Sequence, residues 1–149
     1  MIIPRDIREL IATGPLAHLV TLNADGSPQV TGIWIGLDGE DIVSGHTADH
    51  RKLKNIRRDP RVAISLQYPD KHPQLGIQQF VVLYGEARVE EGGAPELIRR
   101  LAEIYVGPNT NLATENVPRG YVLRTRVKRI AGVRPSSVVN DEYGIADSK

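Results

Sequence analysis

Short runs in which hydrophobic residues alternate with polar or small ones recur along this chain, and turn residues separate them. Runs of this kind are typical of β-strands that bury one face. We expect strands at residues 17–23, 29–37, 41–45, 61–67, 78–90 and 121–133. Asp25-Gly26 and Asp38-Gly39 lie between the first three runs, and an Asp-Gly pair in that place is a strong signal for a β-hairpin. The first three strands are therefore predicted to form an antiparallel meander.

Hydrophobic residues follow helical spacing in three other segments. We expect a short helix that begins at Pro4, a second helix between Asp49 and Asp59, and a third at residues 94–106. Asp49 is a suitable N-cap, and Asp59 ends the second helix because the residue before Pro60 is disfavoured in the α conformation.

The order of these elements predicts the class of fold. After the leading helix it reads β-β-β-α-β-β-α-β with tight hairpins, which favours a mostly antiparallel sheet that closes into a barrel with helices packed outside. A chain of 149 residues is long enough for one domain with a substantial core, and we take residues 1–149 as that domain. We expect the loop 107–120 and the tail 134–149 to be mobile, or to be ordered only by a partner or ligand.

Composition excludes several kinds of chemistry. The chain has no cysteine, which removes disulfides, thiolate nucleophiles and iron–sulfur clusters, so any redox reaction needs a bound cofactor. No hydrophobic run reaches the roughly 18–20 residues that cross a bilayer. Charged residues interrupt the N-terminal segment, so we expect a cytoplasmic protein without stable membrane insertion. The histidines lack the spacing of a metal site and no Gly-x-Ser-x-Gly motif appears, so we assign no metal ligand and no catalytic side chain.

The second helix carries the main candidate chemistry. Leu53 and Ile56 lie three residues apart, so they share the face that packs on the body of the protein. At roughly 100° per residue, Lys52 lies on the shoulder of that face with Asn55 beside it, whereas Lys54 points away. Lys52 is therefore the cation that we expect to face a pocket.

A phosphate site is the hypothesis that these residues favour. Arg51 adds guanidinium donors near the positive end of the helix, where backbone N–H groups can also bind an anion. Together with Lys52 and a turn at Gly45-His46-Thr47, it describes a cradle for a phosphate. The alternative is that these residues are solvated charges on the surface of an amphipathic helix.

The distribution of charge bears on the size of the ligand. Residues 50–61 contain six basic residues and one acid, a net charge of +5, whereas the whole chain carries only +1. Because the positive charge is local, a small anion fits better than a nucleic acid, which requires basic residues over a broader face.

The predicted strand 29–37 contains the only tryptophan. Strand alternation places Val30, Gly32, Trp34 and Gly36 on one face. Bare backbone on both sides of a large aromatic residue leaves a slot for a planar ring system. The alternative is that the glycines relieve strain where a barrel strand bends, and that Trp34 fills the core.

Two stretches carry a resemblance to a known family: LVTLNADGSPQVTGIWIGLDGEDIVSGHTADHRKLKNIRRDPRVAISL, and VVLYGEARVEE after it. They resemble the pyridoxamine 5′-phosphate oxidase-like split β-barrel family, and more narrowly its actinobacterial branch that uses the deazaflavin coenzyme F420. The resemblance covers roughly residues 5–135, and its densest part is residues 51–60. It implies a mostly β split barrel with flanking helices, and a homodimer with cofactors in clefts between the subunits.

The resemblance also implies a set of cofactor-binding residues. These are Arg51, Lys52, Asn55, His46, Thr47, His50, Trp34 and Gln79. In the family the basic pair holds the phosphate of the ribityl chain, which falls on Arg51 and Lys52 here, and Trp34 lies near the tricyclic ring. Gln79, or its neighbour Gln78, is expected to reach the cofactor of the partner subunit.

The implied activity is a two-electron reduction by an F420H2-dependent reductase. Reduced deazaflavin passes hydride to an activated double bond, a quinone or a similar small acceptor, while the protein binds and orients both molecules. The tail of F420 is anionic, which would favour the further cations Lys54, Arg57 and Arg58 at the rim. FMN is the alternative cofactor. A non-catalytic flavin or deazaflavin carrier and a nucleic-acid-binding regulator are the rival functions.

Overall fold

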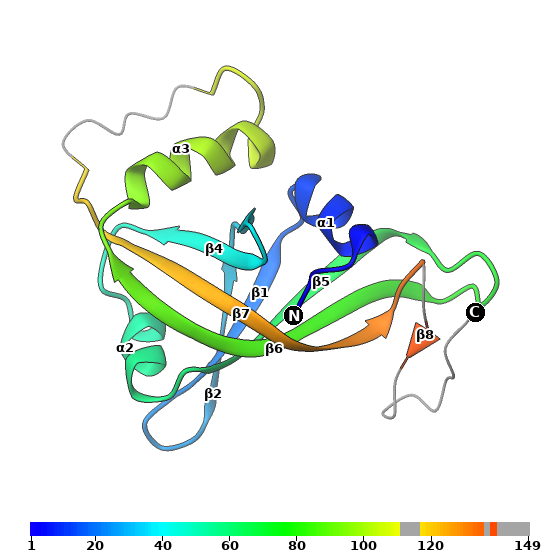
Figure 1. Cartoon of the computed structure of the whole chain (residues 1–149), viewed down its shortest axis with the longest axis horizontal. Coiled ribbons are helices and arrows are strands. Elements are labelled where there is room, and N and C mark those ends of the chain that lie inside the picture. Colours follow the sequence, from blue (N-terminus) through cyan, green and yellow to red (C-terminus); the bar gives the residue numbers. More distant parts are fainter. Residues whose placement is uncertain (111–116, 136–137, 140–149) are drawn as a thin grey trace.

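The structure, a computed structural model, describes residues 1–110, 117–135 and 138–139 (Figure 1). The helices in this part of the chain are α1 (Arg5–Ala12), α2 (Arg51–Arg58) and α3 (Ala94–Tyr105). The strands are β1 (Ala17–Leu22), β2 (Pro28–Ile33), β3 (Gly36–Asp38), β4 (Asp41–His46), β5 (Arg61–Lys71), β6 (Gln78–Glu91), β7 (Tyr121–Val133) and β8 (Val138–Val139).

The strands form one antiparallel sheet in the order β2-β1-β5-β6-β7-β4-β3, with β8 paired to β7. β2 and β3 stand at opposite ends of this order, yet only Trp34 and Ile35 separate them in the sequence. The sheet therefore curls until its two ends meet, which gives the closed barrel of Figure 1. The predicted antiparallel barrel with helices outside is confirmed.

The predicted strand 29–37 is wrong in one respect, because it is divided into β2 and β3. Its first half pairs with β1 and its second half pairs with β4, so the predicted meander is split between the two ends of the sheet. The ladder is interrupted at Trp34 and Ile35, where the backbone N–H of Ile35 donates to the hydroxyl of Tyr105 at 3.1 Å. A barrel strand that changes neighbours has to bend, and a side chain satisfies the freed N–H here.

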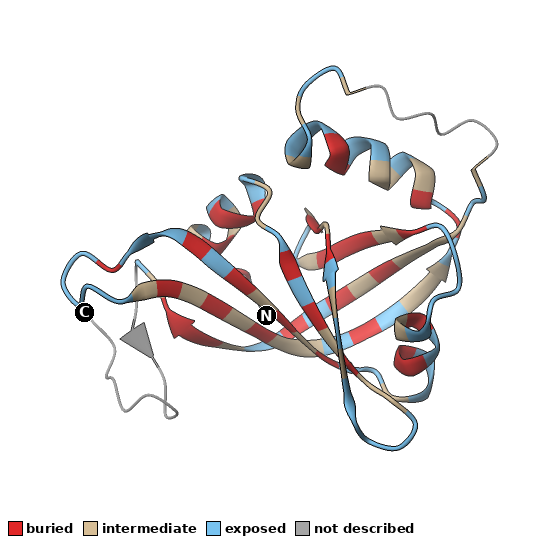
Figure 2. Cartoon of the chain, turned by 180° about the vertical axis from the view of Figure 1, so that it is seen from behind, coloured by how far each residue is buried: buried red, intermediate tan, exposed pale blue. Residues whose placement is uncertain are grey.

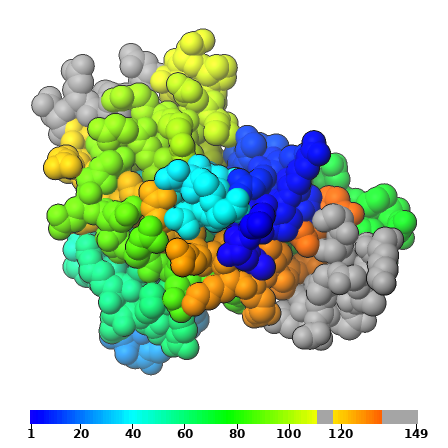
Figure 3. Space-filling model, in the orientation of Figure 1, coloured from blue at the N-terminus to red at the C-terminus, as the bar shows by residue number. Residues whose placement is uncertain are grey.

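The core lies inside the barrel and under the helices that cover it. Alternate residues along the strands are buried, as Figure 2 shows, and Leu19, Ile64 and Leu83 are almost fully enclosed. α2 packs on this core through Leu53 and Ile56, as predicted, which are 0% and 2% exposed. α3 lies against β4, and the space-filling view shows it in yellow-green above the cyan β3–β4 hairpin (Figure 3). None of the helices in the described ranges has the length and hydrophobicity to cross a membrane.

The boundaries of α2 correct two expectations. The N-cap is His50 and not Asp49, because Asp49 lies one residue outside the helix and its carboxylate pairs with Arg57 at 2.7 Å. His46 does not lie in a turn but is the last residue of β4, where it pairs with Tyr121. The helix ends at Arg58, before Asp59-Pro60, as predicted.

The remaining differences concern connections. β5 runs to Lys71, so the predicted strand 61–67 was too short. The loop 107–120 and the tail 134–149, which we expected to be mobile, fall partly outside the described residues. Within that tail, Val138–Val139 add the short strand β8, which the sequence did not predict.

Candidate functional site

A hollow of about 290 Å³ lies where β2, the end of β4, α2 and α3 meet. We call it the Lys52 hollow, and its walls are formed by Leu16, Gly32, Ile33, Trp34, Gly45, His46, Lys52, Ile98 and Leu101. The fold thus brings together three residues that the sequence proposed for one site: Trp34, His46 and Lys52. They come from three separate segments of the chain. Most of the other wall residues are apolar.

Lys52 is the cation of this hollow. Its side chain is half-buried, and burial lowers the pKa of its ammonium group below the ordinary value. Within the described ranges, no carboxylate lies close enough to form an ion pair with Lys52. A half-buried charge without a counter-ion raises the free energy of the folded protein, and an anionic ligand would relieve that cost.

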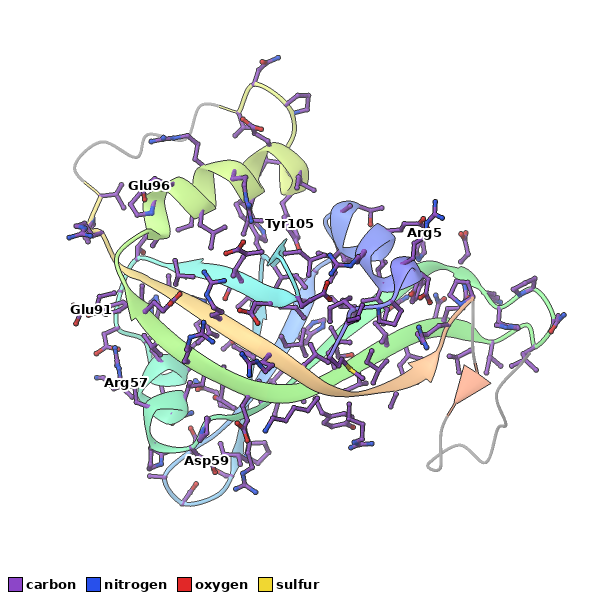
Figure 4. All side chains as sticks on the ribbon, in the orientation of Figure 1. Arg5, Arg57, Asp59, Glu91, Glu96 and Tyr105 are labelled. Carbon is purple, nitrogen blue, oxygen red and sulfur yellow. The ribbon has the colours of Figure 1, made fainter. Side chains whose placement is uncertain are left out.

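Other cations of α2 are already engaged within the protein. Arg57, labelled in Figure 4, pairs with Asp49 at 2.7 Å, and its guanidinium lies over the ring of Tyr121, 5.3 Å from the centroid. Arg58 donates to the backbone carbonyl of Leu22 and to Oδ1 of Asn55. These contacts stabilise the fold, so Arg57 and Arg58 are not the free rim cations that the sequence suggested.

Arg51 faces a different hollow from Lys52. A space of about 540 Å³ between α2 and the β1–β2 turn is lined by Asn23, Ala24, Asp25, Ser27, Arg51, Lys54, Asn55 and Arg58. Successive helical residues project about 100° apart, which separates the two neighbouring cations. Within one chain, Arg51 and Lys52 therefore do not line a common hollow.

Asn55 is buried, with 2% of its surface exposed. Its Nδ2 donates to Thr21 Oγ1 and Asn23 Oδ1 at 3.0 Å and to Gln29 Oε1 at 3.2 Å, while its Oδ1 accepts from Arg58. Asn55 therefore joins α2 to the β1–β2 hairpin. The sequence placed it beside the packed face of the helix but could not show that residues of the β1–β2 hairpin would accept from both of its N–H groups.

His46 is also buried, with 6% of its surface exposed, and its Nε2 lies 2.8 Å from Oγ of Ser44. Burial, together with the smaller effects of the positive charges of Lys52 and His50, lowers the pKa of this imidazole to about 4. His46 is therefore neutral at neutral pH. Sequence reasoning did not single out Ser44 and so missed this contact, although residues i and i+2 of a strand share one face.

The other proposed residues lie outside the Lys52 hollow. His50 is the exposed N-cap of α2, and Thr47 lines a separate space of about 470 Å³ that also contains Arg119. Gln79 lies near the start of β6, where its Nε2 donates to the backbone carbonyl of Asp70 at 3.1 Å. Its Oε1 is buried and has no hydrogen-bond partner among the described residues. Gln79 does not line the hollow of its own chain.

The slot expected beside Trp34 is only half present. A Cβ at Gly36 would come 2.8 Å from Leu101 Cδ2, so this glycine lets α3 pack closely and does not open a slot. Gly32 lines the hollow, and the nearest atom to a Cβ there would be Leu16 Cδ1 at 3.3 Å. The break after β2 ends the alternation on which the symmetric slot depended.

A larger hollow of about 630 Å³ adjoins the first, and Leu16 forms a wall of both. It is lined by Leu10, Thr13, Pro15, Leu16, His18, Ser65, Leu66, Gln67, Tyr68, Pro69 and Phe80. No pattern in the sequence indicates this hollow, because its walls come from α1, the segment after it, β1, β5 and β6, which meet only in the folded barrel.

This closed antiparallel architecture is the split barrel, a fold found among proteins that bind flavin or deazaflavin cofactors. The chain belongs to the pyridoxamine 5′-phosphate oxidase family, whose sequence pattern matches residues 3–134. A comparison with curated protein sequences found no match.

Solved structures of the same fold include an F420 reductase. It is 25% identical to this chain, with a TM-score of 0.71, over 87% of this chain and 98% of the reductase. A conserved hypothetical protein from Mycobacterium tuberculosis is 22% identical, with a TM-score of 0.70, over 100% of this chain and 92% of that protein. An FMN-binding protein from Syntrophomonas wolfei is 15% identical, with a TM-score of 0.62, over 91% of this chain and 86% of that protein.

Proposed function

We propose that this protein is a cytoplasmic, homodimeric oxidoreductase that binds coenzyme F420 and reduces a small organic acceptor such as an enone or a quinone. Its similarity to a solved F420 reductase over nearly the whole length of both chains supports this choice of cofactor. When bound, the reduced deazaflavin supplies the hydride.

The observation that carries the proposal is the environment of Lys52. An ammonium group that is half-buried, lacks a carboxylate partner in the described structure and lines a mainly apolar hollow suits the phosphate of an otherwise apolar, planar ligand. Lys52 would hold that phosphate. Arg51, on the other side of the helix, would take a more distant anionic group of the same ligand.

The other walls of the hollow suit the rest of such a ligand. Gly32 has no side chain to cover the backbone of β2, and Trp34, which stacks on Tyr105, lines the same wall. Leu16, Ile98 and Leu101 exclude water. The protein would thus bind and orient cofactor and acceptor, and it needs no nucleophile of its own.

An apolar face of the sheet supports the proposed dimer. Directly paired positions place Val30, Val20, Ala63 and Tyr84 in one row across β2, β1, β5 and β6. Val30 is 60% exposed, and Leu16, which walls both hollows, is 56% exposed. A second copy on this face would bury these side chains and complete the cleft. We propose separately that Gln79 contacts the cofactor held by the other subunit, and that Thr47 and His50 are secondary contacts. Asn55 would act indirectly, by joining α2 to the β1–β2 hairpin.

Titration of the purified protein with F420 and with FMN, followed by fluorescence, tests the cofactor. We expect tight binding of F420 and a dimer in light scattering. Tight binding of FMN with none of F420 would establish the alternative cofactor. A bound deazaflavin without reduction of any quinone, enone or nitro compound would indicate a carrier, and steeply salt-dependent DNA binding would indicate a regulator.

A further inference from the structure

Ser44 and His46 form a hydrogen-bonded pair at the wall of the Lys52 hollow. They lie two residues apart on β4, so both side chains point to the same face of the strand. Ser44 is 3% exposed and His46 is 6% exposed, and Ser44 Oγ lies 2.8 Å from His46 Nε2. Only His46 reaches the hollow.

The hydrogen bond between Ser44 and His46 favours one tautomer of the imidazole. The hydroxyl of Ser44 is buried, and Nε2 of His46 is its sole partner in the described part of the chain. If Nε2 carried the proton, the hydroxyl would accept that bond and its own hydrogen would lack an acceptor, which costs free energy in a buried site. The arrangement that leaves the sealed hydroxyl of Ser44 with an acceptor has Ser44 donating to Nε2. A neutral His46 then carries its proton on Nδ1.

The surroundings favour a neutral imidazole. Within the described structure, the charged or titratable groups that act on His46 are Lys52 and His50, and both are basic. The atoms of α3 nearest to the neighbouring Gly45 belong to the side chain of Ile98 and the backbone oxygen of Ala94, and Tyr121 is the opposite residue on β7. Nδ1 has no partner among the described residues and is not one of the sealed, unsatisfied atoms, so it is available to the hollow.

We propose that Ser44 is a positioning residue that holds His46 as its Nδ1–H tautomer, so that His46 donates a hydrogen bond to an oxygen of the anionic group bound by Lys52. This role rests on the proposed cofactor site. A neutral N–H and a nearby ammonium together provide two donors for one phosphate. Because the pKa of His46 is lowered to about 4 by burial, the donor keeps the same protonation state across the physiological range.

Nitrogen-15 NMR of the imidazole groups in the whole protein tests the tautomer directly. In the free protein at pH 7 we expect a protonated Nδ1 and a hydrogen-bonded, unprotonated Nε2 for His46. Ser44→Ala should give the signals of a mixture of tautomers. Ser44→Thr, which keeps the hydroxyl, should give the same signals as the wild-type protein. Thr125→Val removes another buried hydroxyl, on the neighbouring β7, and should leave the tautomer unchanged.

Binding of F420 to the same variants provides the second measurement. We expect Ser44→Ala to weaken the affinity roughly 3- to 10-fold and Ser44→Thr to recover most of it. An Nε2–H tautomer in the wild-type protein, or an unchanged tautomer in Ser44→Ala, overturns the positioning role even where F420 binds. Failure of wild-type protein to bind F420 overturns the cofactor assignment instead, while the tautomer is still read from the NMR signal. Should Ser44→Ala not fold, the wild-type spectrum and Ser44→Thr still decide the tautomer.

Discussion

The indole ring of Trp34 stacks on the phenol ring of Tyr105, with ring centroids 5.3 Å apart and an angle of 12° between the planes. The hydroxyl of Tyr105, a residue labelled in Figure 4, donates to the backbone carbonyl of Pro15 at 2.7 Å and accepts from the N–H of Ile35. One side chain at the end of α3 thus fixes the bend between β2 and β3 against the start of β1. The wall of the Lys52 hollow that contains Trp34 depends on this contact.

Tyr105→Phe should lower the free energy of unfolding by about 1–3 kcal/mol, because it leaves the N–H of Ile35 and the carbonyl of Pro15 without their partner while the ring remains. Urea denaturation followed by Trp34 fluorescence measures the effect. Tyr84→Phe is the matched control, since Tyr84 makes its described contact through its ring, under Arg129, and should change stability by less than about 0.5 kcal/mol. Equal effects of the two changes would contradict the bridging role of Tyr105.

Local patterns were sufficient to predict the hairpins, the end of α2 and the closed antiparallel barrel. Asp-Gly turns and Asp59-Pro60 act within a few residues, so a sequence displays them directly. The division of β2 from β3 could not be predicted in this way, because it depends on Tyr105, 70 residues away from Ile35. The symmetric slot beside Trp34 was wrong for the same reason, since a distant helix fills the space next to Gly36.

Lys52→Ala should weaken F420 binding by about 1–3 kcal/mol, or roughly 5- to 150-fold, because it removes a charge-assisted hydrogen bond to the phosphate. Lys54→Ala is the matched control, since it removes the same charge from an exposed residue of the same helix that does not line the Lys52 hollow, and it should cost clearly less affinity. Isothermal titration calorimetry at two salt concentrations separates a direct contact from a general effect of net charge. Similar losses in both variants would show that Lys52 makes no specific contact.

Two glycines that line the hollow should respond differently to alanine. At Gly45 a Cβ would come 2.9 Å from Ile98 Cγ1 and 3.1 Å from the backbone oxygen of Ala94, so Gly45→Ala should push α3 away and destabilise the protein by about 1–3 kcal/mol. At Gly32 a Cβ would meet only the flexible side chain of Leu16, at 3.3 Å. Gly32→Ala should therefore preserve stability and weaken ligand binding.

Thermal unfolding and cofactor titration of the two glycine variants provide the measurements. If Gly32→Ala bound F420 as tightly as the wild-type protein, the backbone of β2 would not lie against the ligand. If Gly45→Ala were as stable as the wild type, α3 would have to be less closely packed on β4 than the structure shows.

Asn55→Ala should lower the free energy of unfolding by about 1–3 kcal/mol, since it leaves Thr21, Asn23 and Gln29 without their shared donor. Denaturation experiments measure this loss. Lys54→Ala again serves as the control, because it changes an exposed residue of the same helix. An Asn55→Ala protein that kept its stability but lost cofactor affinity would instead support a direct contact with the ligand.

The candidate site was predictable in part, for a physical reason. Helical geometry alone placed Lys52 beside the packed face and Lys54 outside it, because projection around a helix depends only on residue spacing. It could not show that the side-chain amide of Asn55 would donate its hydrogen bonds to the β1–β2 hairpin, or that Ser44 would form a hydrogen bond with His46. These contacts join segments whose approach is set by the closure of the barrel.

Acid should destabilise the protein through His46. Its pKa is about 4 in the folded protein and about 6.5 in the unfolded chain. Between these values the unfolded chain binds a proton that the folded protein does not, so the free energy of unfolding falls as the pH drops from 6.5 towards 4. The largest loss from this group is about 3 kcal/mol.

His46→Gln, which keeps a polar side chain but cannot titrate, isolates the contribution of His46 to this pH dependence. The acidic groups whose pKa values are lowered, such as Asp59 and Glu40, lose their stabilising charge only at still lower pH, so the window from 6.5 to 4.5 mainly reports histidines. We expect chemical denaturation to show a clearly shallower dependence on pH in this window for His46→Gln than for the wild type. Identical slopes would mean that the imidazole of His46 is solvated and protonates normally, which is incompatible with its burial beside Ser44 and Lys52.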